Sequence, residues 1–184
     1  MNDNKQVKGI SRINRELMYK GAILDIYKDT MKLPNDSIEE WDFVSHRMGA
    51  AAVLPVMPDG RIVMVRQYRI AIGRETIEIP AGCRDSLAED TKVTAERELQ
   101  EETGYSSDDI SFLISIKTTV AFCDEAVDVY LAKNLKLGKQ MLDEAEEIDV
   151  EYYSLEELCK RIYAGEIQDS KTVAAIMAYS NSIK

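Results

Sequence analysis

The sequence holds no long uninterrupted apolar run, and its first ten residues, MNDNKQVKGI, are polar. A transmembrane helix needs about 20 consecutive, mostly apolar residues. A secretory signal peptide needs a shorter apolar run after a basic start. The sequence therefore predicts a chain without a membrane span and without a signal peptide.

Cysteine and histidine are scarce, at 3 and 1 residues. Cys83, Cys123 and Cys159 show no CxxC or Cys/His spacing of the kind that binds zinc, and their odd number does not suggest a set of disulfides. No histidine stands near Cys83 in the sequence to activate it as a nucleophile. We therefore expect structural thiols in a reduced, cytoplasmic protein.

Basic residues are also in deficit, with 23 Lys and Arg against 33 Asp and Glu and a formal charge of −10. Nucleic acids and anionic membranes select basic surfaces, so neither is expected as the main partner. A small anionic substrate is compatible with this charge, because a bound divalent cation can invert the local potential.

The 184 residues, 45% of them hydrophobic, are enough for one domain with a substantial core. Apolar residues that alternate with polar ones, and turn residues such as Pro58-Asp59-Gly60, predict a series of strands. The predicted strands are 22–33, 41–46, 50–57, 61–68, 76–79, 111–120, 126–132 and 148–154. Strands and helices interleave without a regular βαβ repeat, which favours an α+β fold with mixed strand pairing.

Three helices are expected from their end signals. Asp90 is a good cap for the first helix, and Gly104 follows its end. Ser154 and Glu157 have the form of a capping box at the start of the second. The helices are predicted from Thr91 to about Thr103, from Ser154 to about Ala164, and from about Lys171 to Tyr179, the last capped by Asp169 or Ser170.

The stretch RELQEETGY, residues 97–105, ends the first helix and carries Glu98, Glu101 and Glu102. Spacings of three and four residues put these carboxylates on one side of the helix, where like charges cost roughly 0.2–0.5 kcal/mol a pair. A bound divalent cation such as Mg²⁺ removes that repulsion, since it takes clustered carboxylate oxygens. Arg97, four residues before Glu101, can orient one carboxylate. Taken alone, such a run is more often a solvated acidic face.

These glutamates belong to a longer pattern that resembles the Nudix box, G-x5-E-x7-R-E-U-x-E-E-x-G-U, in which U is bulky and apolar. Residues 82–105 match it from Glu89 onward, through Arg97 to Gly104. The departure is at the start, where six residues instead of five separate Gly82 from Glu89. Extra length is tolerated better in a loop than in a helix, so we expect a longer loop and an intact helix. The resemblance implies a Nudix hydrolase, an α/β/α sandwich around a mixed β-sheet that cleaves nucleoside diphosphates linked to another moiety.

The resemblance extends over about residues 20–180 to the ADP-ribose pyrophosphatase branch. It rests on VRQYR (65–69), ETIEIPAG (75–82), AFCDE (121–125), the acidic loop LDEAEEIDV (142–150) and DSKTVAAI (169–176). This branch usually has Pro-Gly shortly after the box, where this chain has Val120-Ala121. The resemblance implies two regions: an N-terminal antiparallel β segment at 1–47 that builds a homodimer, and a Nudix domain at 48–184. The substrate is expected near the subunit interface.

The resemblance also implies the residues that hold the metal, Mg²⁺ with Mn²⁺ as a substitute. Glu98 and Glu102 are the strongest expected ligands, and the Ala81 carbonyl and Glu146 complete the set. Metal ions at such a site neutralise the pyrophosphate and lower the pKa of a bound water.

Five residues receive other roles from the same resemblance. Glu144 is the expected base that takes a proton from water. Glu101 either contacts metal or accepts a hydrogen bond from Arg97. Arg69 and Gly82 are expected to bind the substrate. Without the resemblance, the acidic loop is an ordinary polar loop, and the arginine is a solvated residue at a strand end.

The implied reaction is the Mg²⁺-dependent hydrolysis of ADP-ribose to AMP and ribose 5-phosphate. Two alternatives stay open, namely another nucleotide sugar or a dinucleotide as substrate, or a nucleotide-binding sensor without turnover. Such sensors tend to have a damaged box, whereas all three box glutamates are present here. Trp41, Tyr68 and Phe122 are the candidates for stacking on adenine, and the sequence does not choose among them.

Overall fold

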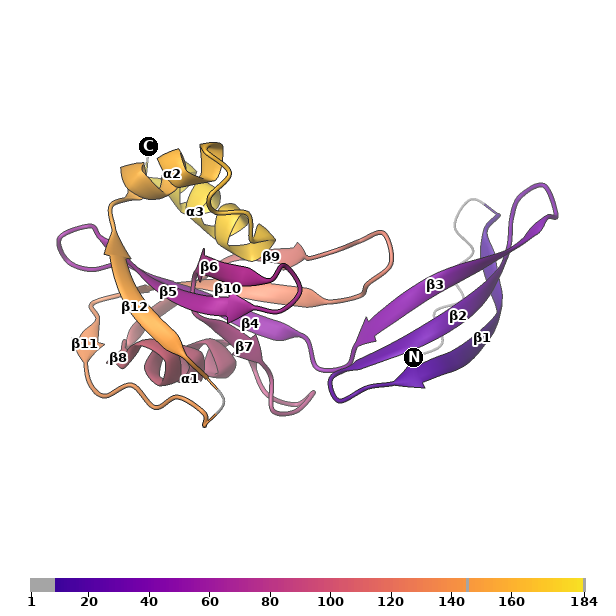
Figure 1. The fold of residues 1–184 in the computed structure, drawn as a ribbon, viewed down its shortest axis with the longest axis horizontal. Coiled ribbons are helices and arrows are strands. Elements are labelled where there is room, and N and C mark those ends of the chain that lie inside the picture. Colours follow the sequence, from indigo (N-terminus) through magenta and orange to yellow (C-terminus); the bar gives the residue numbers. More distant parts are fainter. Residues whose placement is uncertain (1–8, 145, 184) are drawn as a thin grey trace. The chain divides into compact units, whose positions relative to one another are not determined.

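The computed structural model describes residues 9–144 and 146–183, which form two compact units. One unit contains the described residues up to Arg47 together with Lys117–Glu125, and the other contains Met48–Ile116 and the chain from Ala126 onward. Figure 1 labels the elements of both units. Within the described ranges, no helix is both long and apolar enough to cross a membrane.

The first unit is an antiparallel sheet whose strands are β1 (Ser11–Lys20), β2 (Leu24–Lys32) and β3 (Ile38–His46), in that order. Charge contributes strongly to its packing. Arg15 donates to both carboxylate oxygens of Asp29, at 2.6 and 2.5 Å, and its guanidinium lies 4.1 Å from the ring centroid of Phe43. The sequence does not predict β1, because most of its side chains are exposed and its apolar residues do not alternate regularly.

The second unit contains two sheets and a short two-stranded ladder. Its strands are β4 (Ala50–Pro55), β5 (Ile62–Arg69), β6 (Arg74–Glu78), β7 (Ala81–Cys83), β8 (Tyr105–Ser106), β9 (Asp109–Lys117), β10 (Ala126–Lys133), β11 (Lys136–Leu137) and β12 (Ile148–Tyr153). The four-stranded sheet has the order β7-β4-β10-β9, with β10 parallel and β7 antiparallel to β4. The three-stranded sheet, β12-β5-β6, is antiparallel, and β8 pairs with β11.

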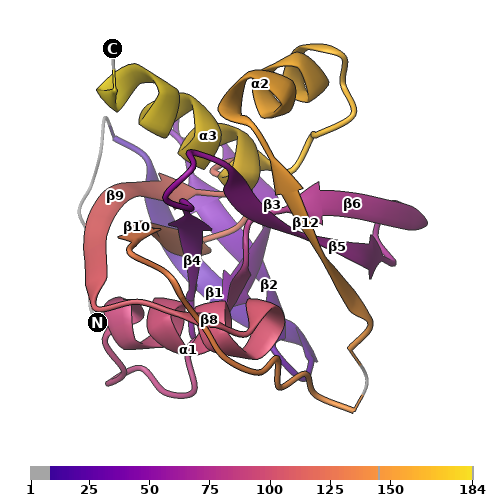
Figure 2. The same ribbon diagram turned by 90° about the vertical axis from the view of Figure 1, so that its left-hand side faces the viewer.

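Helices cover both faces of these sheets. They are α1 (Thr91–Thr103), α2 (Leu155–Tyr163) and α3 (Ser170–Ser182). Figure 2 shows α1 on one side of the strands and α2 with α3 on the other. Successive side chains of β4 point to opposite faces of the sheet. Val53 packs in a cluster with Leu99 of α1, and Leu54 packs in a cluster with Ile176 of α3. The predicted α/β/α sandwich around a mixed sheet is confirmed.

The helix ends that have sequence signals agree with them, whereas α3 continues beyond its expected end at Tyr179 to Ser182. Asp90 caps α1, and Gly104 ends it with a left-handed φ of 74°. Ser154 forms the predicted capping box at the start of α2. Asp169, one of the two candidates, caps α3. These helix ends are set by neighbouring residues in the chain, and the sequence therefore predicts them well.

The segment after Pro80 differs from its prediction. The sequence predicts a loop there, but Ala81–Cys83 form β7, whose backbone pairs with Ala50–Ala52 of β4. Three residues with a central glycine carry no strand pattern, so only the ladder to β4 defines them. This pairing fixes the backbone on which the candidate site is built.

Candidate active site

Two glutamates of α1 are buried near its C-terminal end. Glu98 and Glu102 are 8% and 4% exposed, whereas Glu101 is only partly buried. Glu98 lies directly against Gly82, because a Cβ atom at residue 82 would come within 2.0 Å of Glu98 Oε1. The glycine therefore leaves room for a carboxylate between α1 and β7.

Arg97 is the centre of an acidic cluster. Its Nη1 donates to Glu98 Oε1 at 2.8 Å and to Glu101 Oε2 at 2.9 Å. It also lies 3.7 Å from a carboxylate oxygen of Asp85 and 3.8 Å from one of Glu89. One guanidinium thus lies within ion-pair distance of four carboxylates. Burial opposes the charged form of Arg97, but the acidic neighbours outweigh it and raise the pKa of Arg97 well above its usual range. The local charge is strongly negative.

The buried carboxylates hold their protons more tightly than usual. Burial raises the pKa of Glu98 to about 7, and the neighbouring charges of Glu101 and Glu146 act in the same direction, against the attraction of Arg97. Burial also raises the pKa of Glu102 to about 8, with Glu98 as the next cause. Burial and mutual repulsion disfavour the ionised form of these two neighbouring acids, and a bound cation would stabilise that form.

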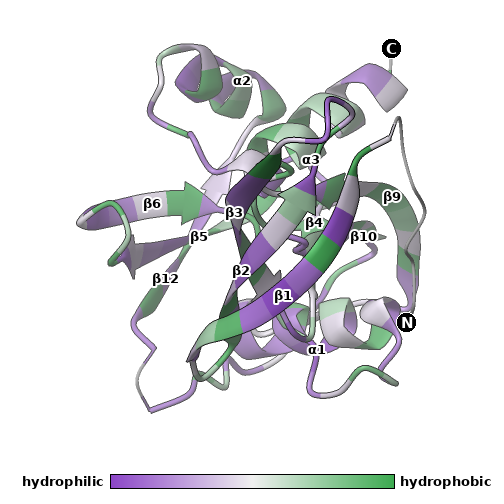
Figure 3. Cartoon of the chain, turned by 90° about the vertical axis from the view of Figure 1, so that its right-hand side faces the viewer, coloured by the Kyte–Doolittle hydropathy of each residue, from purple (hydrophilic) through white to green (hydrophobic). Residues whose placement is uncertain are grey.

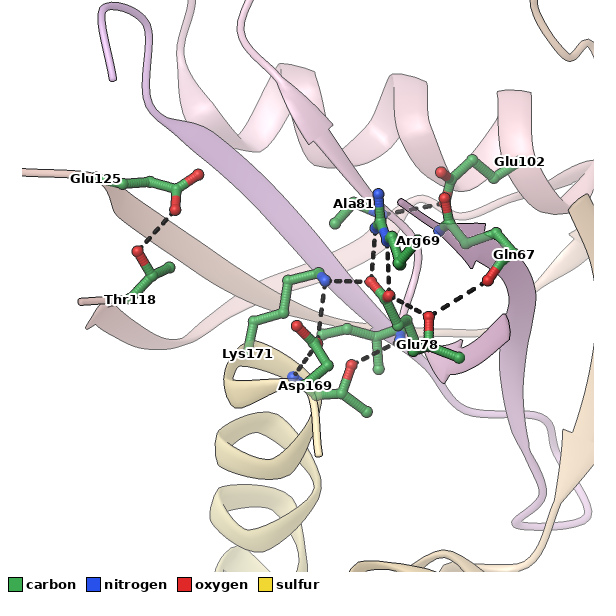
Figure 4. Close-up of polar contacts among 12 residues, drawn as sticks. Gln67, Arg69, Glu78, Ala81, Glu102, Thr118, Glu125, Asp169 and Lys171 are labelled. Carbon is green, nitrogen blue, oxygen red and sulfur yellow. Dashed lines mark hydrogen bonds and ion pairs between the residues drawn. The ribbon is translucent and has the colours of Figure 1, made fainter. Parts of the chain in front are cut away.

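Backbone and loop groups complete this arrangement. The Ala81 N–H donates to Glu102 Oε2 at 3.1 Å, which fixes β7 against α1 (Figure 4). Glu146 is close enough for its charge to raise the pKa of both buried glutamates. Glu144 and Glu146 line one cavity of about 480 Å³, together with Gln67, Tyr68, Glu147 and Ile148.

The longer box loop is held by its own polar groups. Arg84 Nε donates to the Met48 carbonyl at 2.6 Å. Glu89 Oε2 accepts from the Asp85 N–H at 2.7 Å. The extra residue is thereby accommodated before Asp90, and α1 begins where the sequence predicts. The same bond shows that Glu89 orders the loop.

Arg69 lies in a network that the sequence does not predict. Its Nε and Nη2 donate to the two oxygens of Glu78, at 2.7 and 2.6 Å. Thr76 and Lys171 donate to the same carboxylate, which is 2% exposed (Figure 4). The Arg69 side chain at the end of β5 is therefore bound by a buried carboxylate and is not merely solvated. The sequence signal for Glu78 is a lone acid within the otherwise apolar end of ETIEIP.

Val120, at one of the two positions that replace the usual Pro-Gly, is 82% exposed. It belongs to the segment Lys117–Glu125 of the first unit. This segment joins β3, since the Val44 N–H donates to the Phe122 carbonyl at 2.7 Å and the Asp124 N–H donates to the Val44 carbonyl at 3.2 Å. The departure from the family pattern therefore lies outside the unit that carries the glutamates.

Residues 46–176 match the family model described as NUDIX domain, which is well over half of the chain. The chain belongs to the Nudix family. The hydrolase predicted from the box is thereby confirmed at the level of the family.

Nudix relatives resemble this chain over most of its length. It is 38% identical over 166 residues to an ADP-ribose pyrophosphatase of Bacillus subtilis, covering 89% of each chain. It is 39% identical to the methanol dehydrogenase activator of Bacillus methanolicus, again over 89% of each. An ADP-ribose pyrophosphatase of Mycobacterium tuberculosis is 35% identical and matches 90% of this chain and 81% of its own. A crystal structure of an ADP compounds hydrolase has the same fold, with a TM-score of 0.85 at 16% identity and coverage of 95% and 94%.

The acidic cluster fits the divalent cation that Nudix hydrolases generally use. Glu98 and Glu102 offer buried carboxylate oxygens, and Gly82 lacks the side chain that would fill the space beside Glu98. Across residues 9–144 and 146–183, no three His, Cys, Asp or Glu side chains already gather at one point. Mg²⁺ ordinarily takes its further ligands from water and substrate phosphates, so two carboxylates on a rigid helix are a sufficient start.

The raised pKa values predict an unusual dependence of stability on pH. Without metal, the folded protein binds more protons than the unfolded chain between pH 4.5 and about 8, because Glu98 and Glu102 titrate near 7 and 8 instead of 4.5. Their contribution is complete below pH 4.5 and is lost as the pH rises through 7 and 8. In EDTA, we expect Tm to be lower by about 5 °C or more at pH 8 than at pH 6.

Differential scanning calorimetry at the two pH values, with and without Mg²⁺, measures this effect. Mg²⁺ should raise Tm more at pH 8, where protons compete less for the same carboxylates. A metal-free Tm that is the same or higher at pH 8 would contradict the assignment of high pKa values to this pair.

Proposed function

We propose that this Nudix protein hydrolyses the pyrophosphate bond of ADP-ribose with Mg²⁺, giving AMP and ribose 5-phosphate. The observation that supports the chemistry is the buried pair Glu98 and Glu102. Both side chains lie against β7, and Arg97 donates to Glu98 at 2.8 Å. The choice of ADP-ribose rests on two relatives that carry this activity in their names and match most of the chain.

In this proposal the metal is held by Glu98, Glu102, the Ala81 carbonyl and Glu146. A bound Mg²⁺ neutralises the phosphates and lowers the pKa of the attacking water. Arg97 keeps Glu98 in place through its bond at 2.8 Å, so that the carboxylate does not have to reorganise during turnover.

The remaining site residues act on the substrate and on protons. Glu144 is exposed and lines the same cavity as Glu146, which suits a base that receives the proton of the attacking water. Glu101 holds Arg97 at 2.9 Å and keeps it oriented. Arg69 retains an exposed edge beyond its pair with Glu78 and is proposed to contact a phosphate. Gly82 is proposed to bind the substrate through its backbone, since the Glu98 carboxylate fills the space where a side chain would lie.

A substrate panel tests this function. ADP-ribose, ADP-glucose, diadenosine polyphosphates and NADH are incubated with the protein and Mg²⁺, and the products are separated. We expect ADP-ribose to give the highest kcat/KM, and hydrolysis in ¹⁸O-labelled water identifies the phosphorus that is attacked. Preference for another compound would change the proposed substrate to another nucleotide sugar or a dinucleotide. Val120-Ala121 in place of Pro-Gly is the departure that weakens the assignment of ADP-ribose. No hydrolysis of any compound would favour a sensor.

We further propose that residues 1–47 mediate a homodimer and that 48–184 is the hydrolase domain. The first unit carries several exposed apolar side chains on β1 and β3, and Figure 3 shows apolar bands along β1. They are Ile13, Leu17, Met18, Tyr19, Ile38 and Trp41. Exposed apolar surface of this kind marks association sites.

Size-exclusion chromatography with light scattering measures the assembly. We expect twice the mass of one 20.8 kDa chain at micromolar concentration. Replacing Leu17 by Glu should lower the association, because a charge would then enter the apolar surface. Glu16→Gln, on the neighbouring residue, serves as the control. A wild-type monomer would rule out the dimer.

A further inference from the structure

The carboxylate of Glu78 is saturated with donors from three parts of the chain. Oε1 accepts from Arg69 at 2.7 Å and from Thr76 at 2.6 Å, and Oε2 accepts from Arg69 at 2.6 Å and from Lys171. These bonds and charges hold the pKa of Glu78 down at about 2 in spite of its burial. A carboxylate with four donors is an anchor, and it is neither a metal ligand nor a base.

The start of α3 holds the backbone that follows Glu78. The Ile79 N–H donates to Thr172 Oγ1 at 3.0 Å, and the Thr172 side chain is fully buried. Lys171, two residues after the helix cap Asp169, donates to that residue at 3.0 Å as well as to Glu78. Two successive residues of α3 thus bind neighbouring groups of the segment: Lys171 bonds the side chain of Glu78, and Thr172 bonds the main chain of Ile79.

Every residue from Glu78 to Ala81 is held by another element. After the two contacts with α3, the Pro80 carbonyl accepts from the Val53 N–H of β4 at 2.9 Å. The Ala81 N–H then donates to Glu102 of α1 at 3.1 Å. The four-residue segment 78–81 therefore connects α3, on one face of the sheets, with the buried glutamates of α1 on the other.

The network is more than core packing. Arg69, Glu78, Asp169 and Lys171 line a cavity of about 300 Å³. The segment that the network holds also reaches the proposed metal platform, because the Ala81 N–H donates to Glu102 at 3.1 Å.

We propose that Lys171 and Thr172 are positioning residues of the hydrolase site. They fix the segment 78–81 so that the Ala81 carbonyl stays at the metal and the Arg69 guanidinium stays at the substrate phosphates. Neither residue touches the reacting atoms. The inference rests on the proposed function for its activity readout, but the metal readout stands without it.

Thr172→Val and Thr172→Ser form the decisive pair of variants. Valine keeps the volume and removes the acceptor of the Ile79 N–H, whereas serine keeps the hydroxyl and loses a methyl group. We expect Thr172→Val to raise the Mn²⁺ dissociation constant, measured by calorimetry without substrate, and to lower kcat by about 10-fold or more. Thr172→Ser should stay within about 3-fold of the wild type in both, because the hydrogen bond is retained.

Lys171→Met provides a second, independent test, with Lys160→Met as its control. Lys160 forms an exposed pair with Glu156 on α2, so its loss should change little. Lys171→Met should lower kcat and weaken Mn²⁺ binding by about 10-fold. If Thr172→Val does not fold, this variant tests the positioning role by itself. All measurements are made well below the Tm of each variant.

The outcomes separate the two proposals. Wild-type Mn²⁺ binding and kcat in Thr172→Val and Lys171→Met, with only a lowered Tm, would overturn the positioning role. Weakened Mn²⁺ binding in both variants supports it, even if the wild type hydrolyses no compound of the panel. In that case the proposed hydrolysis fails, and the positioning role at the metal site stands.

Discussion

Replacing Glu102 by Gln should lower kcat/KM for ADP-ribose by at least about 100-fold and at the same time raise the thermal stability of the metal-free protein. The loss is expected because Glu102 is a charged ligand of the divalent cation in the proposed function. The gain follows from burial, which raises the Glu102 pKa to about 8 and so makes its ionised form costly in the folded state. Gln keeps an oxygen that can accept from the Ala81 N–H.

The gain in Tm should be larger at pH 8 than at pH 6, because more of the wild-type carboxylate is ionised there, and on the order of 5 °C at pH 8. Glu98→Gln should show the same loss of activity. Its stability gain should be smaller, since Glu98 also has Arg97 as a partner at 2.8 Å. Glu96→Gln is the matched control, an exposed acid on the same helix that should change neither quantity. Wild-type turnover in both variants would contradict the assignment of these glutamates as metal ligands.

The parts of the site that the sequence predicts are those with local causes. The helix α1 follows from Asp90 and Gly104, and its periodicity places Glu98 and Glu102 on one side. Their burial is a tertiary matter, because it depends on packing against β4 and β7. The sequence alone leaves open whether this face is solvated, and the position of Gly82 against Glu98 answers that question.

The parts that the sequence does not predict have long-range causes. Lys171 and Glu78 are 93 residues apart, and nothing near either residue indicates the partner. Likewise, the family resemblance predicts Arg69 as a phosphate ligand, but its two hydrogen bonds to Glu78 depend on the pairing of β5 with β6. The strand β1 is defined by its pairing with β2, and Arg15 of β1 bonds Asp29, 14 residues away. Such contacts require the fold before they can be named.

A separate prediction concerns Gly82, whose replacement by alanine should abolish most activity through a single steric contact. The backbone of Gly82 needs no left-handed φ, so alanine meets no conformational penalty there. The new Cβ would lie 2.0 Å from Glu98 Oε1 and 2.3 Å from its Cδ, far inside contact distance. Because Glu98 is buried and held by Arg97, its carboxylate can yield only by leaving the metal platform. We expect at least about a 100-fold fall in kcat and a destabilisation of about 1–3 kcal/mol.

A double-mutant cycle isolates this contact. In a Glu98→Ala background the atoms that clash with the new Cβ are gone, so Gly82→Ala should then cost almost nothing in the free energy of unfolding, measured by urea denaturation. Equal destabilisation in both backgrounds would mean that residue 82 acts through the β7 backbone and not through Glu98. A fully active single variant would mean that Glu98 can move aside without leaving the metal. The cycle therefore tests directly whether this glycine is required because a ligand carboxylate occupies the space of its missing side chain.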